Sequence, residues 1–204
     1  MKRLLPGMLS FILWLCCAIL MATGWRGVLL RGIPRTILLL VGLFWLLYHD
    51  AGFGLLPEGR GIQPVWLLWC MIAGCLAGMQ AQASGWIMFA LAGRIVLIGA
   101  VWLWTALLSQ SAVWPLPLLP AHSAAYLMMI AIVLLCSRDW THQWIMLTLG
   151  LTAGEWLSQL KLSSAAEFGG AAVQDAWWLV FVTVRLLSAV IEWSRHKWWQ
   201  TRLQ

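Results

Sequence analysis

The segment Gln174–Trp193, QDAWWLVFVTVRLLSAVIEW, restricts the possible folds of this chain more than any other stretch. It is about 20 residues long, and a helix of that length spans the ~30 Å hydrocarbon core of a bilayer. Its interior is strongly apolar, tryptophans stand near both ends, and Arg195 and Lys197 follow it. Tryptophans and basic residues at the ends of an apolar helix are typical membrane-surface anchors. The segment therefore predicts a transmembrane helix.

The composition extends this interpretation to all 204 residues. Apolar residues make up 62% of the chain and charged residues 10%, whereas an ordinary globular domain has roughly 45–50% and ~25%. A soluble chain of this size still exposes about a third of its surface, so it could not keep so many apolar side chains away from water. We therefore expect an all-α, polytopic transmembrane helical bundle with no soluble domain.

The hydropathy pattern predicts six or seven spans within one transmembrane domain, 1–204. The first apolar run follows two basic residues, as it would in a secretory signal peptide. It exits into Gly24, Trp25 and Arg26, without the small residues of a cleavage site, and we therefore expect a retained span. Loss of the short second span would change the orientation of the N-terminus. The expected spans are 4–24, 36–52, 64–81, 86–108, 120–136, 140–160 and 174–193.

The loop charges predict how the bundle is oriented. With seven spans the two chain ends lie on opposite sides, and the side with more lysine and arginine is normally cytoplasmic. We therefore expect the C-terminus in the cytoplasm, and basic loops also explain the net charge of +6 without a nucleic-acid partner. The richer side carries Arg26, Arg31, Arg35, Arg138, Arg195, Lys197 and Arg202, and the other side carries Lys2, Arg3, Arg60 and Lys161.

The N-terminal half also carries a resemblance in layout. An apolar opening span exits through Gly24-Trp25 into the basic linker Leu29-Leu30-Arg31-Gly32, and short Trp-edged spans follow over most of the chain. This layout resembles the YphA-type integral membrane proteins of spore-forming Gram-positive bacteria. The resemblance implies a location in the bacterial plasma membrane, and it carries over no site residues because it includes no catalytic motif.

Cysteine and tryptophan usage fits a bilayer environment. All five cysteines (Cys16, Cys17, Cys70, Cys75, Cys136) lie in apolar runs, where cysteine behaves as a small hydrophobe. No Cys/His set has the spacing of zinc ligands, so we expect no disulfide, metal or cofactor. Most of the seventeen tryptophans lie near predicted span ends, where we expect interfacial anchors, and Trp14 and Trp45 lie deeper. The expected anchors are Trp25, Trp66, Trp86, Trp114, Trp140, Trp144, Trp177, Trp178 and Trp193.

Three charges fall inside predicted spans: Arg94, Glu155 and Arg185. Each costs about 2.5–3.5 kcal/mol on insertion scales, so such residues are the first candidates for a site. Arg94 and Arg185 lie at similar predicted depth and could line an anion or lipid-headgroup pocket. Alternatively, both side chains snorkel to the headgroups, and Arg185 pairs with Glu192 on the same helix face.

Glu155 belongs to a polar stripe on one helix face, together with Thr148, Thr152 and Gln159. The last span carries a second stripe, formed by Gln174, Arg185, Ser188 and Glu192. Two such stripes suggest that the last two spans face each other or a wet crevice. The stripes act either as hydrogen-bonded helix contacts or as the lining of a solute or proton path. The candidate polar site is therefore Arg94, Glu155, Arg185, Thr152, Gln159 and Glu192.

Two GxxxG pairs, Gly74/Gly78 and Gly150/Gly154, predict close helix packing. Small residues four apart allow helix backbones to approach closely in lipid. Gly74 and Gly78 lie in the third expected span, and Gly150 and Gly154 lie in the sixth. We expect both pairs to be helix-packing positions.

The sequence does not predict an enzyme, and we expect no catalytic residue. Ser84 and His122 are expected at opposite membrane faces, so they cannot form a nucleophile and base pair. There is no HExxH motif and no acidic cluster suited to Mg²⁺. We expect a non-enzymatic protein that acts through helix association with itself or with other membrane proteins. The alternative is a small solute or ion transporter using Arg94, Glu155 and Arg185, although the internal repeat of many transporters is not evident.

Overall fold

The computed structural model describes residues 8–22, 36, 42–44, 62–83, 85–110, 121–162 and 168–202. This part of the chain is helical, with short turns and one isolated parallel bridge between Ile62 and Phe168. The expected all-α class is confirmed for these residues. The main helices are α1 (Met8–Ala22), α4 (Pro64–Ala83), α5 (Gly85–Gln110), α6 (Ala121–Cys136), α7 (Trp140–Leu162) and α8 (Ala171–Arg202).

Several expectations concern residues outside this part. They include most of the second expected span (36–52), the basic linker Trp25–Arg35, the loop charges Lys2, Arg3 and Arg60, and the tryptophans Trp25, Trp45 and Trp114. Ser84 also lies outside the described residues.

Three helical segments are long and apolar enough to cross a membrane: Pro64–Gln82, Gly85–Leu108 and Ala171–Arg195. Only 22–44% of each segment's apolar window is buried inside the protein, so most of these side chains need an apolar environment outside it. Met8–Ile19 and Ser123–Cys136 are shorter apolar helices. These features support a membrane protein, whereas the number of spans, six or seven, remains a prediction.

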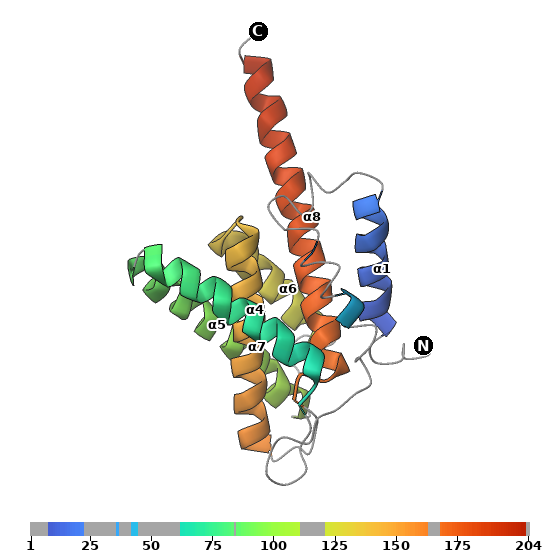
Figure 1. Ribbon diagram of the computed structural model, residues 1–204, viewed down its shortest axis with the longest axis vertical. Helices are drawn as coiled ribbons and strands as arrows, with labels where there is room; N and C mark the ends of the chain where they lie inside the picture. The colour runs from blue at the N-terminus through green and yellow to red at the C-terminus, as the bar shows by residue number, and fades with distance from the viewer. Residues whose placement is uncertain are drawn as a thin grey trace.

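Helix α7 lies in the middle of the bundle, and α4, α5, α6 and α8 all contact it. α5 makes its most extensive contact with α7, and α4 also packs on α7, running obliquely across it in Figure 1. α6 packs against α5 and α8, and α1 lies beside α8. The C-terminal part of α8 extends beyond the end of the bundle (Figure 1). α7 is 23 residues long, and its polar stripe is possible because most of its surface faces protein.

The contact between α5 and α7 depends on glycine. A Cβ built at Gly154 would lie 2.7 Å from the carbonyl oxygen of Gly99, and one built at Gly150 would lie 2.7 Å from the Cβ of Ile98. These distances are too short for any side chain. Gly150 and Gly154 therefore bring the α7 backbone directly against α5, as a GxxxG pair does in a membrane.

A cluster of aromatic rings forms the centre of the core. The rings of Trp69 and Trp177 have centroids 4.4 Å apart, and Trp144 packs edge-on against Trp177 at 4.6 Å. Phe181 stacks on Trp177 with centroids 4.7 Å apart, and Trp178 completes the cluster against Trp69 and Trp177. Pairs at these separations add about 0.5–1.5 kcal/mol beyond area burial.

This core overturns part of the expectation about tryptophan. Trp66, Trp144, Trp177 and Trp178, expected as interfacial anchors, have at most 3% of their surface exposed. They lie near helix ends in sequence, but their faces of α4, α7 and α8 point inward. Trp86 and Trp193 are exposed, as an anchor at a membrane surface would be.

Candidate functional site

The buried guanidinium of Arg185 lies against the turn that joins α6 to α7. Arg185 is only 7% exposed. Its Nη1 donates to the backbone oxygen of Arg138 at 3.2 Å and to Oε1 of Gln143 at 3.4 Å. Gln143 is fully buried, and its Nε2 donates to the carbonyl of Ser137 at 2.9 Å and to Oγ of Ser188 at 3.4 Å. These bonds tie α8 to the start of α7.

The turn itself is held by local hydrogen bonds. The Asp139 amide donates to Oγ of Ser137 at 3.2 Å, and the Gln143 amide donates to the carbonyl of Asp139 at 3.0 Å. His142 lies in the first turn of α7, and its Nδ1 is 3.2 Å from Oδ2 of Asp139, the residue just before that helix. The turn therefore places Arg138 and Asp139 at the end of the bundle with a defined backbone geometry.

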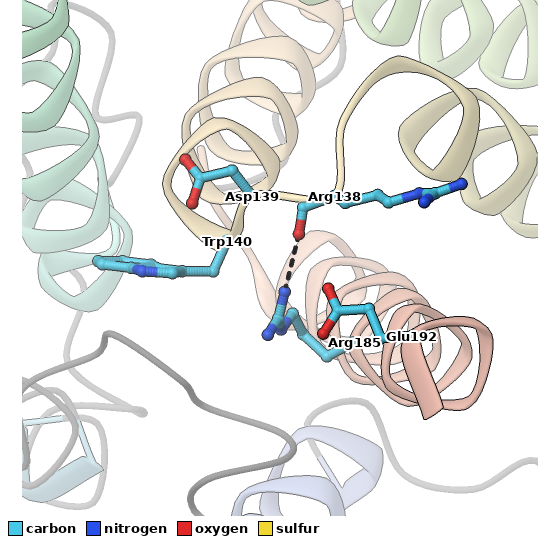
Figure 2. A pocket seen from close by; sticks show the side chains of 5 residues that line it. All are labelled: Arg138, Asp139, Trp140, Arg185 and Glu192. Atoms are coloured by element: carbon cyan, nitrogen blue, oxygen red, sulfur yellow. Dashed lines mark hydrogen bonds between the residues drawn. The ribbon is translucent and has the colours of Figure 1, made fainter. Parts of the chain in front are cut away.

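A pocket of about 240 Å³ opens beside this turn, lined by Arg138, Asp139, Trp140, Arg185 and Glu192. Figure 2 shows Arg185 and Glu192 reaching from α8 toward the turn, with Trp140 and Asp139 on the other side. The Arg138 side chain points away from Arg185, so that its carbonyl faces the guanidinium (Figure 2). The pocket thus places the guanidinium of Arg185 beside the Arg138 backbone, with the carboxylates of Asp139 and Glu192 and the indole of Trp140 also in its lining.

Glu155 lies near the other end of α7, where it binds the backbone before α8. The Gly169 amide donates to Oε2 of Glu155 at 2.9 Å, and Nε2 of Gln174 donates to the carbonyl of Gly169 at 2.9 Å. Gly169 has a φ of +73° and lies against the Trp66 ring, so a Cβ there would collide with that ring. Glu155 and Gly169 therefore close this end of the bundle.

The polar stripe of α7 between these ends is used in hydrogen bonds inside the protein. Oγ1 of Thr148 accepts from Nε1 of Trp177 at 3.0 Å, and Oγ1 of Thr152 accepts from Nε1 of Trp66 at 3.2 Å. Thr152 also donates to the carbonyl of Thr148 at 2.6 Å. Gln159 is buried, and its Nε2 has no partner in the described part of the chain. The arrangement of Thr148 and Thr152 matches helix contacts rather than an open path.

The three predicted intramembrane charges do not meet. Arg185 binds Gln143, whereas Glu155 lies twelve positions further along α7, or about 18 Å along a helix. Arg94 is on α5, half-exposed, with no hydrogen-bond partner among the residues that the structure describes. Among the candidate polar residues, Arg185 and Glu192 line the same pocket.

The two GxxxG pairs have different positions. Gly150 and Gly154 pack against α5, as described above. Gly74 and Gly78 lie on the outer face of α4, where an added Cβ would meet nothing within 4 Å. This pair is therefore not used in packing within the described chain.

Sequence reasoning missed the residues that hold the helices together at polar contacts. No sequence pattern indicates Gln143 or Asp139, and Arg138 is expected only as a loop charge. The pairing of Ser10 with Asp175 was also missed: the Ser10 amide and hydroxyl donate to Oδ1 of Asp175 at 2.8 and 2.5 Å. An acid near the start of α8 is a usual signal of a helix N-terminus, but nothing in the sequence indicates Ser10 as its partner.

The described part of the chain is helical, and three of its helices are long and apolar enough to cross a membrane. No known protein family, curated protein or solved structure matches this chain.

Proposed function

We propose that this chain is a non-enzymatic, multi-pass protein of the bacterial plasma membrane that acts through lateral helix association. In this proposal the protein lies in the plasma membrane and its C-terminus is in the cytoplasm, as expected from the sequence. Its support is one observation: the GxxxG pair Gly74/Gly78 on the outer face of an apolar helix has no packing partner among the residues that the structure describes. The resemblance to YphA-type membrane proteins agrees with this location but adds no site.

The association surface is the outer face of α4, here called the α4 face. Met71 and Met79 are 61% and 68% exposed, and Gly74, Cys75 and Gly78 lie between them on the exposed side. A groove of small residues flanked by flexible methionines allows another helix backbone to approach. The surface is therefore apolar and has the low relief that helix packing in lipid needs.

The same chain shows what such a pair does when it is covered. At Gly150 and Gly154, backbone and side-chain atoms of α5 fill the space that a side chain would otherwise occupy. At Gly74 and Gly78 the equivalent space is open. The two pairs have the same spacing, and they differ in whether another helix of the described chain covers them.

A second copy of this chain is the partner that the α4 face fits. Small-xxx-small faces are self-complementary, because the groove of one helix receives the small residues of the same helix in another molecule. Such a contact has two-fold symmetry, which is the commonest symmetry of homo-oligomers. In this arrangement the Cys75 thiols of the two copies lie near the axis.

The transporter alternative finds less support in this arrangement. A solute path using Arg94, Glu155 and Arg185 requires these groups to line one cavity, and they lie at three separate places. The threonines of the α7 stripe are engaged with Trp66 and Trp177. We therefore do not propose transport as the function.

Cysteine cross-linking in native membranes tests the proposal. A variant that retains only Cys75, with Cys70→Ser to keep the contact with Thr152, should form a disulfide-linked dimer on mild oxidation. A variant that retains only Cys16, which is exposed on α1, is the matched control and should stay monomeric. Gly74→Leu in the Cys75-only variant should abolish the dimer at unchanged membrane abundance. Equal cross-linking at Cys16 and Cys75, or none at Cys75, would refute the proposal.

A further inference from the structure

The pocket beside the α6–α7 turn lies where a membrane protein meets lipid headgroups. The turn residues Ser137–Asp139 interrupt two helices, and the apolar segment of α8 ends close by at Arg195. Beyond the turn α8 projects without the other helices (Figure 1). Trp140 lines the pocket, and Trp193 is exposed on α8 one residue after Glu192. Indole rings at this level are typical of the membrane–water boundary.

The charged groups of the pocket lie at different depths. Arg185 is buried at its inner side and is held in place by its bonds to the turn. Glu192 and Asp139 are exposed nearer the mouth, and Asp139 is in contact with His142. A guanidinium attracts phosphate oxygens, and a carboxylate attracts an ammonium group. With a guanidinium at its inner side and carboxylates nearer its mouth, the pocket complements a zwitterion rather than a simple anion.

The size of the pocket limits what it can hold. A volume of about 240 Å³ is below the ~300–1,000 Å³ of typical drug-sized ligand sites. It can hold a headgroup but not acyl chains.

We propose that this pocket binds a phosphoethanolamine group, as carried by an ethanolamine phospholipid of the membrane. The phosphate lies toward Arg185, and the ammonium lies toward Glu192. A primary ammonium donates hydrogen bonds to a carboxylate. A choline group has no N–H to donate, so the pocket prefers ethanolamine.

Lipid retention by the purified full-length protein tests this site. Protein is purified from nanodiscs containing equal amounts of ethanolamine, choline and glycerol phospholipids, and the retained lipid is measured by native mass spectrometry. The ethanolamine lipid should be retained about tenfold over the choline lipid, the ratio expected for one hydrogen bond to a charged group. Equal retention of the two lipids, or preference for the anionic glycerol lipid, would overturn the proposal.

Three variants separate the site from general lipid contact. Glu192→Gln should lower ethanolamine-lipid retention about tenfold, and Glu192→Asp should restore part of it. Arg94→Gln, at an arginine outside the pocket, should leave retention unchanged. If Glu192→Gln retains as much ethanolamine lipid as the unchanged protein, the site is wrongly assigned.

Soluble phosphoethanolamine carries the same phosphate and ammonium groups as the lipid headgroup, so it is the alternative ligand. Soluble phosphoethanolamine should displace the lipid only at large excess, because it lacks acyl chains. If it binds as tightly as the lipid does, the ligand is a soluble metabolite and the lipid assignment fails. The pocket includes no residue of the α4 face, so the lipid-retention test and the Cys75 cross-linking test can fail independently.

Discussion

Gly99 of α5 and Gly154 of α7 touch through their backbones, with the Gly99 carbonyl oxygen only 2.7 Å from where a Cβ on Gly154 would lie. This contact holds the two helices closer than any pair of residues with side chains would allow. It lies in the most extensive helix contact of the bundle. The physical consequences of this contact are directly measurable.

Gly154→Ala is expected to destabilise the protein. The added methyl group must push α5 and α7 apart, because it meets the backbone of Gly99 and the Cβ of Trp102, and overpacking of this kind costs about 1–3 kcal/mol. Thermal unfolding in detergent measures the loss. Gly78→Ala is the matched control, since a Cβ there meets nothing within 4 Å; equal destabilisation by both substitutions would contradict the α5–α7 contact.

Gly169→Ala should also lower stability, for a different reason. Gly169 has a φ of +73°, which costs a residue with a Cβ about 1–2 kcal/mol, and the new methyl group collides with Trp66. Gly170→Ala lacks the positive φ and serves as the control. Denaturation midpoints of the two variants should differ clearly; if they coincide, the role assigned to Gly169 is wrong.

Arg185→Gln should lower folded abundance as well as any activity. The substitution removes the hydrogen bonds of Nη1 to Arg138 and Gln143, and bonds to charged groups contribute about 1.5–3 kcal/mol. Membrane abundance and thermal unfolding measure the effect. Arg94→Gln should change stability by no more than about 0.5 kcal/mol, as for most surface substitutions. The reverse order of the two variants would show that Arg185 is not held as described.

Ser10→Ala should loosen α1 without unfolding the bundle. It removes the hydroxyl bond to Asp175 while the backbone bond at 2.8 Å remains, so the expected cost is about 1 kcal/mol. Hydrogen exchange should increase in Met8–Ala22 first, because α1 opens locally. Ser158→Ala is the control, since Ser158 donates within its own helix to Glu155. Unchanged exchange in α1 would argue against the contact.

Much of the local structure could be predicted from the sequence. Apolar length is a property of a continuous segment, so the segments beginning at Pro64 and near Trp86 and Gln174 could be recognised as helices suited to a bilayer. Pro64 itself begins α4, because proline needs no amide partner at a first helical position and the carbonyl of Gln63 accepts from Leu67 at 3.1 Å. The membrane environment follows from the same local chemistry.

The candidate site could be predicted only in part. Spacing placed Arg185 and Glu192 on one face of a helix, and both line the same pocket. The partners of Arg185, however, are a carbonyl and an amide about forty residues away in sequence. No pattern within one helix indicates which distant backbone will meet it.

What the sequence by itself determined is the helical class and the apolar surface, because both depend on neighbouring residues of one segment. Only the tertiary structure decided which face of each helix is covered. Two GxxxG pairs of the same spacing therefore differ, one packed against α5 and one exposed on α4. Tryptophans near helix ends likewise divide between a buried core and the surface. The reason is that burial depends on how helices cross, and crossing is set by contacts between segments far apart in the chain.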